Sequence, residues 1–201
     1  MDLAALEKNL KWRGIKLTVF ATKEEAADYL VREIRGKTVG FGGSMTLESM
    51  GLYEKLKANH NEVFWHWRQD MSADEARKRA YTADVYLSSL NGVAETGELV
   101  NIDGGGNRVA ATQTKHEKVY FVVGENKIAP DLQAAIHRAR NIAAPLNAKR
   151  LHSRTPCAVK ADHCYDCKSP DRICRSLCIF WERPTLVDAC ELVLIRENLG
   201  Y

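Results

Sequence analysis

The sequence has little of what marks several classes of protein. It contains only 5 prolines among 201 residues, no internal repeat and no low-complexity tract, and its 45% apolar and 27% charged residues exclude a disordered or collagen-like chain. No segment approaches the roughly 18 consecutive apolar residues of a membrane helix. Residues 1–8 carry acids and bases where a signal peptide would be apolar. We therefore expect a soluble, cytoplasmic protein without a membrane partner.

An excess of charge of one sign is also missing. The 29 basic and 26 acidic residues leave a net charge of +3, which is too small to predict a polyanionic partner. We therefore expect no nucleic-acid partner. The length fits one domain spanning residues 1–201, and whether it forms a homo-oligomer stays open.

Strand and helix patterns alternate along the chain. Thr22 and Ser72 each stand three residues before a glutamate and so predict helix starts. Short apolar, β-branched runs predict strands at 17–20, 38–41, 63–67, 84–88, 118–123 and 191–195. This order predicts an α/β fold, a layered sheet of mostly parallel strands with flanking helices. Residues 98–102 and 107–111 predict a hairpin around the glycines at 104–106.

A glycine-rich segment lies between a predicted strand and a predicted helix. Gly42, Gly43 and Ser44 follow the strand at 38–41, where backbone N–H groups and the helix dipole could bind a phosphate or a carboxylate. The segment lacks the third glycine of a dinucleotide-binding motif, because Met45 stands there. The alternative is a tight turn without a ligand.

A second candidate site follows the strand at 84–88. Glu95 could act there as a general base or as a nucleophile, and the alternative is a solvated turn glutamate. The polar residues expected to bind a ligand beside it are Thr96, Asn101, Asp103, Asn107 and Arg108. The alternative for Asn and Asp is turn formation, because their side chains bond to nearby backbone.

Five of the six cysteines lie in the loop-rich segment 150–184. Cys157, Cys164, Cys167 and Cys174 include a C-x2-C pair, and four thiolates in a short segment suit zinc or an iron–sulfur cluster. The spacing of the cysteines does not distinguish a zinc site from an iron–sulfur cluster. The alternative is a set of reduced cysteines packed as small apolar residues.

Several segments together resemble the LUD domain family, which is named for lactate utilisation. They are VGFGGSMT at 39–46, AETGELVNIDGGGNRVAA at 94–111, VGENKI at 123–128, AAPLNA at 143–148, and TPC at 155–157 with CYDCKSPDRIC at 164–174. The resemblance implies a NagB/RpiA/CoA-transferase-like fold with ligand loops at the sheet edge. It also implies a role in bacterial lactate oxidation beside iron–sulfur oxidoreductase subunits. The cysteine segment departs from the small lactate-utilisation subunit and indicates a cysteine-bearing branch.

These observations lead to one functional hypothesis and two alternatives. The hypothesis is a protein of lactate or related organic-acid metabolism that holds a small anionic metabolite at the two loops, with Glu95 moving a proton and Arg108 balancing charge. One alternative is an enzyme resembling a CoA transferase or a sugar-phosphate isomerase. The other is a non-catalytic module whose metal element docks a redox partner.

Overall fold

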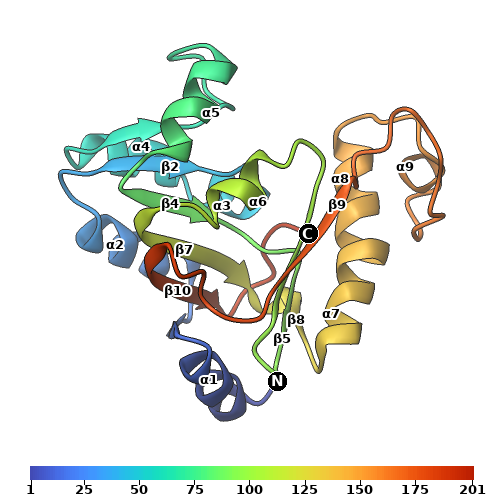
Figure 1. Cartoon of the computed structure of the whole chain (residues 1–201), viewed down its shortest axis with the longest axis horizontal. Coiled ribbons are helices and arrows are strands. Elements are labelled where there is room, and N and C mark those ends of the chain that lie inside the picture. Colours follow the sequence, from blue (N-terminus) through green and yellow to red (C-terminus); the bar gives the residue numbers. More distant parts are fainter.

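The computed structural model describes all residues 1–201 and is built around a six-stranded sheet in which every pair is parallel (Figure 1). Its strands are, in spatial order, β1 (Ile15–Phe20), β10 (Val187–Ile195), β7 (His116–Gly124), β4 (Val85–Ser88), β2 (Thr38–Phe41) and β3 (Glu62–Phe64). Strands buried on both faces need continuous apolar runs, and β4 is buried along its whole length. The predicted α/β fold is confirmed.

The chain forms nine α-helices. They are α1 (Leu3–Trp12), α2 (Lys23–Glu33), α3 (Met45–Ser49), α4 (Leu52–Ala58), α5 (Ala73–Tyr81), α6 (Asn107–Ala111), α7 (Leu132–Arg138), α8 (Ala144–Arg150) and α9 (Pro156–Lys160). The predicted caps are present, because the hydroxyls of Thr22 and Ser72 accept the backbone N–H of Glu25 and Glu75. No helix is long and apolar enough to span a membrane.

Side chains that alternate along the strands divide the core in two. Val85 and Leu87 face the core formed with α2, α3 and α4, whereas Tyr86 faces the core formed with α1, α5 and α6. The second core also receives apolar side chains from a smaller sheet, which therefore covers part of that face.

The smaller sheet has four strands and a helical layer of its own. In order they are β8 (Ile128–Ala129), β5 (Gly92–Ala94), β6 (Leu99–Asp103) and β9 (Ser176–Phe180). Alanines of α7 pack on its outer face. Helices α7 and α8 are joined by a π-helical turn, Ala139–Ala143, and form the helical layer beyond this sheet in Figure 1.

The predicted hairpin between 98–102 and 107–111 is wrong in its second half. Residues 107–111 form helix α6, because Gly106 adopts a left-handed conformation with φ of 78° and Asp103 caps the turn that follows. The true partner of β6 is β5, which precedes it. The predicted strand at 63–67 also ends early, at Phe64.

A buried carboxylate on β10 ties this strand to the edge strand β1, to helix α2 and to β7. Glu191 is 0% exposed and accepts hydrogen bonds from the hydroxyls of Thr18 (2.6 Å) and Tyr29 (2.8 Å). It also forms an ion pair with Lys118 at 2.7 Å. Burial acts to raise the pKa of Glu191, but these partners outweigh it and hold the pKa below its usual value.

Replacing this carboxylate should destabilise the fold. Glu191→Gln leaves the ammonium of Lys118 without its partner and should lower the free energy of unfolding by about 2 kcal/mol, measured by urea denaturation. Glu117→Gln, which breaks an exposed ion pair with Lys37, is the control and should leave stability unchanged.

The contribution of Glu191 to the stability of the folded chain should also depend on pH. Because its pKa is lower in the folded chain, its stabilisation is complete above the unfolded pKa of about 4.3 and is lost as pH falls through the folded value. The stability difference between the natural chain and Glu191→Gln should therefore shrink below about pH 4. A constant difference would contradict the assigned role.

Candidate functional site

A cleft of about 430 Å³ opens where parallel strands of the large sheet end. The loops after β2, β4 and β7 contribute Ser44, Ser89 and Lys127. The end of β6, helix α8 and the segment before β9 close its other sides. The carboxyl ends of parallel strands are the usual place for ligands in α/β folds, and the volume suits a small molecule.

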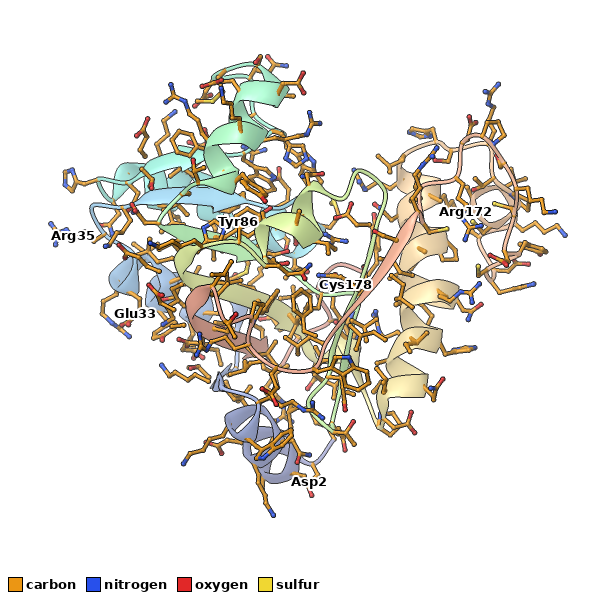
Figure 2. All side chains as sticks on the ribbon, viewed as in Figure 1. Asp2, Glu33, Arg35, Tyr86, Arg172 and Cys178 are labelled. Atoms are coloured by element: carbon orange, nitrogen blue, oxygen red, sulfur yellow. The ribbon has the colours of Figure 1, made fainter.

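Basic side chains dominate the cleft wall. They are Arg108, Lys127, Arg150, Arg172 and Arg175. The one acidic side chain among the lining residues is Asp103, which is already engaged with the protein. Figure 2 places Arg172 in the loop segment beside α8 and α9, far from Arg35 on the opposite side of the molecule. A cleft with this balance attracts anions.

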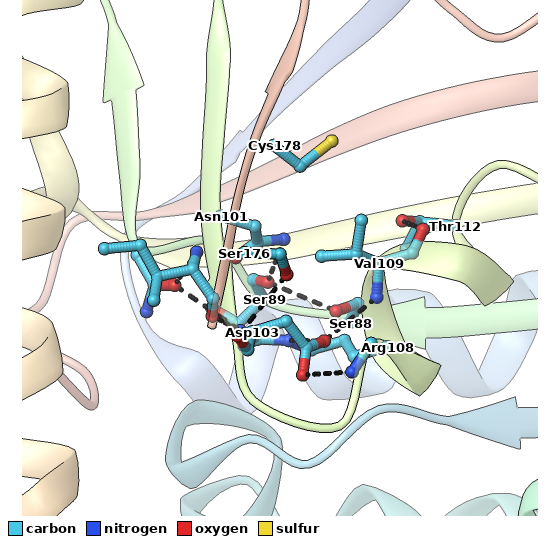
Figure 3. A network of polar contacts seen from close by, with 12 residues as sticks. Ser88, Ser89, Asn101, Asp103, Arg108, Val109, Thr112, Ser176 and Cys178 are labelled. Atoms are coloured by element: carbon cyan, nitrogen blue, oxygen red, sulfur yellow. Dashed lines mark hydrogen bonds and ion pairs between the residues drawn. The ribbon is translucent and has the colours of Figure 1, made fainter. Parts of the chain in front are cut away.

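Asp103 and Arg108 form the polar network drawn in Figure 3. The two oxygens of Asp103 accept the backbone N–H of Gly106 and Val109, each at 3.1 Å, and one lies 3.7 Å from Nε of Arg108. Arg108 also donates to the carbonyl of Ile102 at 2.5 Å. Asp103 therefore serves mainly to cap α6 and to orient Arg108. Asn107 also lines the cleft.

The glycine-rich loop reaches the cleft, but its residues differ in role. The amide of Gly42 donates to the carbonyl of Leu87 at 2.9 Å, and a Cβ there would lie 2.9 Å from the side chain of Arg108. Gly42 therefore allows close packing and does not line the cleft. Gly43 and Ser44 do line it, and the hydroxyl of Ser44 caps α3 by accepting the amide of Leu47.

An aromatic pair supports the same loop from beneath. Trp65 is buried and stacks on Trp67 with ring centroids 5.1 Å apart, and a Cβ on Gly43 would lie 3.1 Å from the Trp67 ring. The guanidinium of Arg150 lies 5.1 Å from the centroid of that ring. Helix α8 is thus held against the loop, with Arg150 at the cleft.

The sequence did not reveal four basic residues of the cleft, and Lys127 is the most buried of them; the others are Arg150, Arg172 and Arg175. Only 3% of Lys127 is exposed, and its Nζ donates to the hydroxyls of Thr46 (3.0 Å) and Ser89 (2.9 Å) with no carboxylate partner. Burial, reinforced by the positive charges of Arg138 and Arg108, lowers the pKa of Lys127 to about 7. Its one sequence signal is its position just after the strand at 118–123.

Three predicted site residues lie elsewhere. Glu95 and Thr96 form the turn between β5 and β6, four residues beyond Asn91, which puts them roughly 13 Å along the strand direction from the cleft end. The carboxylate of Glu95 accepts the backbone N–H of Asp2, and the hydroxyl of Thr96 donates to Glu98. This turn docks α1 against the small sheet. The structure therefore does not bring Glu95 together with the loops that line the cleft.

Asn101 is the third of these residues, and it lies beneath the cleft floor. It is 0% exposed, and its amide donates to the backbone carbonyl of Ser89 at 3.4 Å (Figure 3). Its carbonyl oxygen has no hydrogen-bond partner in the protein. Asn101 thus supports the loop that carries Ser89 and does not line the cleft.

The cysteine segment does not assemble a metal site as it is folded here. No group of three or more His, Cys, Asp or Glu side chains lies close enough together to hold a metal ion. Cys157 contacts the hydroxyl of Thr155, and Cys164 receives contacts from Arg140 and the amide of Asp166. Cys164 and Cys174 instead line a second, smaller cavity. The four thiolates as arranged do not fit zinc or an iron–sulfur cluster.

The fold and the cleft define an α/β protein with an anion-attracting site at the carboxyl edge of a parallel sheet. The sequence profile of the LUD domain matches residues 3–180, so the chain belongs to the LUD domain family. A crystal structure of a DUF162 family protein from Deinococcus radiodurans is similar, with a TM-score of 0.54 at 10% identity. The likeness covers 96% of this chain and 95% of that one, and it shows a shared fold. A search of curated proteins found no significant match.

Removing the carboxylate of Asp103 should destabilise the fold. Asp103→Ala removes two N–H acceptors at the start of α6 and the ion pair with Arg108, so it should lower the free energy of unfolding by about 1–3 kcal/mol. Thermal and urea denaturation measure it. Asp28→Ala, on the exposed side of α2, is the control and should change stability little. Equal effects of the two variants would remove the capping role.

Proposed function

We propose that this LUD-domain protein acts in lactate or related organic-acid utilisation by binding a small carboxylate metabolite in the cleft. The observation that carries the proposal is the wall of five basic side chains around one engaged aspartate. Carboxylates pair with guanidinium groups through charge-assisted hydrogen bonds, and Arg150 and Arg175 make no ion pair that would compete. The family to which the chain belongs supports the choice of an organic acid.

The residues of the cleft have three different roles in this proposal. Arg108 on α6 and Arg150 at the end of α8 both line the cleft and would attract the carboxylate. Trp67 and Ile102 provide apolar surface for the carbon chain. The hydroxyl of Ser89 offers a hydrogen-bonding group at the floor, beside Lys127.

The CoA-transferase alternative has less support. It needs Glu95 to attack an acyl group, and the carboxylate of Glu95 is bonded to the backbone of Asp2 outside the cleft. A sugar phosphate would suit the same basic wall, so phosphate compounds belong in the binding test. Cooperation with iron–sulfur oxidoreductase subunits is a separate proposal, tested by co-purification of such subunits with the tagged chain.

Binding should depend on the basic wall. Lactate and pyruvate should bind to the natural protein in isothermal titration calorimetry, and Arg150→Gln should weaken binding about tenfold because one charge-assisted contact is lost. Arg35→Gln removes an exposed arginine on the far side of the molecule and should leave binding unchanged.

Two results would contradict the proposal. One is equal loss of affinity in both arginine variants, which would indicate a general effect of charge. The other is an absence of lactate and pyruvate binding while a sugar phosphate or CoA binds, which would move the function to the alternative enzyme class. Thermal shift with the same compounds gives an independent reading, because bound ligand raises stability.

The metal hypothesis for Cys157, Cys164, Cys167 and Cys174 stays a separate proposal. It requires the segment between α9 and β9, which has no regular secondary structure, to close around the ion. If it is correct, protein purified without oxygen should contain about one zinc ion or one iron–sulfur cluster per chain by elemental analysis. Amounts of zinc and iron near zero would contradict it.

A further inference from the structure

We propose that Lys127 is the nucleophile of this cleft and that its ε-amine forms an imine with a small carboxylate carrying an aldehyde or ketone, such as a 2-oxo acid. The inference rests on the proposed anion site and adds the class of substrate and the reacting atom. Its basis is the placement of the amine, which lies among hydroxyls at the floor of a basic cleft.

The hydrogen-bond geometry fits a neutral amine. A neutral amine has two N–H donors, and Thr46 and Ser89 accept one each, at 3.0 and 2.9 Å. The fourth tetrahedral position of the nitrogen then holds its lone pair. An ammonium ion in the same place would have a third N–H without an acceptor in the protein, because the contacts of Nζ with the protein end at these two hydroxyls.

The charges around the amine also favour its neutral form. Arg138 and Arg108 are the charged groups that act on Lys127, and both are positive. Asp103 is committed to α6 and Arg108, and Glu125 pairs with Arg196. A pKa near 7 leaves about half of the amine neutral at neutral pH, whereas an ordinary lysine, with a pKa near 10.4, is almost wholly protonated.

The proposed step balances without a further reagent. The nitrogen lone pair attacks the carbonyl carbon, and one proton passes from the nitrogen to the carbonyl oxygen to give a carbinolamine. The C–O bond then breaks, the hydroxyl leaves as water with the second proton of the nitrogen, and a C=N bond to Nζ forms. Arg108 and Arg150 would hold the carboxylate of the same molecule, which explains why the substrate should carry both groups.

Reductive trapping tests the inference. The natural protein is incubated with pyruvate and cyanoborohydride at pH 7, digested, and mapped by mass spectrometry. Lys127 should carry the reduced pyruvate adduct, with at least about tenfold more modification than Lys149, an exposed lysine on α8 close to the cleft. Modification of Lys127 should rise as pH increases from about 6 to 8.

Two variants complete the experiment. Lys127→Met should lose the adduct, whereas Lys149→Arg should form it as the natural chain does. If Lys127→Met does not fold, the peptide map of the natural protein still shows whether Lys127 carries the adduct. Modification spread over exposed lysines with Lys127 unmodified, in protein that binds lactate by calorimetry, overturns this inference alone. Failure to bind either lactate or pyruvate overturns the proposed function as well.

Discussion

Burial of a lysine side chain without a carboxylate partner is the constraint on which the cleft depends. Lys127 lies at the end of β7, beneath the cleft, and bonds to two hydroxyls where a buried lysine would ordinarily face a carboxylate. Arg138 fixes its surroundings by donating to the carbonyls of Asn126 and Asn91. The positive charges of Arg138 and Arg108 favour the neutral form of Lys127, so the charge that would attract an anion comes from the arginines of the cleft.

The rest of the fold serves to build this edge. Six parallel strands place the carboxyl ends of β2, β4 and β7 side by side, and the small sheet with α7 and α8 encloses the space beyond them (Figure 1). Glu191 supplies the opposite case, a buried negative group within β10, and it is surrounded by Lys118, Thr18 and Tyr29. The protein satisfies the buried charge of Glu191 with its own side chains, whereas it gives Lys127 no carboxylate partner.

Much of this architecture could be predicted from the sequence. The apolar runs at 17–20, 38–41, 84–88, 118–123 and 191–195 all belong to the parallel sheet, because period and composition suffice for strands buried on both faces. The loop at Gly43 and Ser44 and the basic side chain of Arg108 also reach the cleft as expected. Glu95 could not be placed correctly, since its distance from the cleft depends on the pairing of β5 with β6. Lys127 was not predicted as a site residue because lysine is usually exposed, and only tertiary packing buries it.

A crystal structure of the protein grown with lactate would show whether the cleft binds a carboxylate. We expect a lactate molecule in the cleft between Arg108 and Arg150, with its carboxylate within hydrogen-bonding distance of at least one of these guanidinium groups. A cleft that stays free of lactate at saturating concentration, or lactate bound only at another surface, would contradict this expectation.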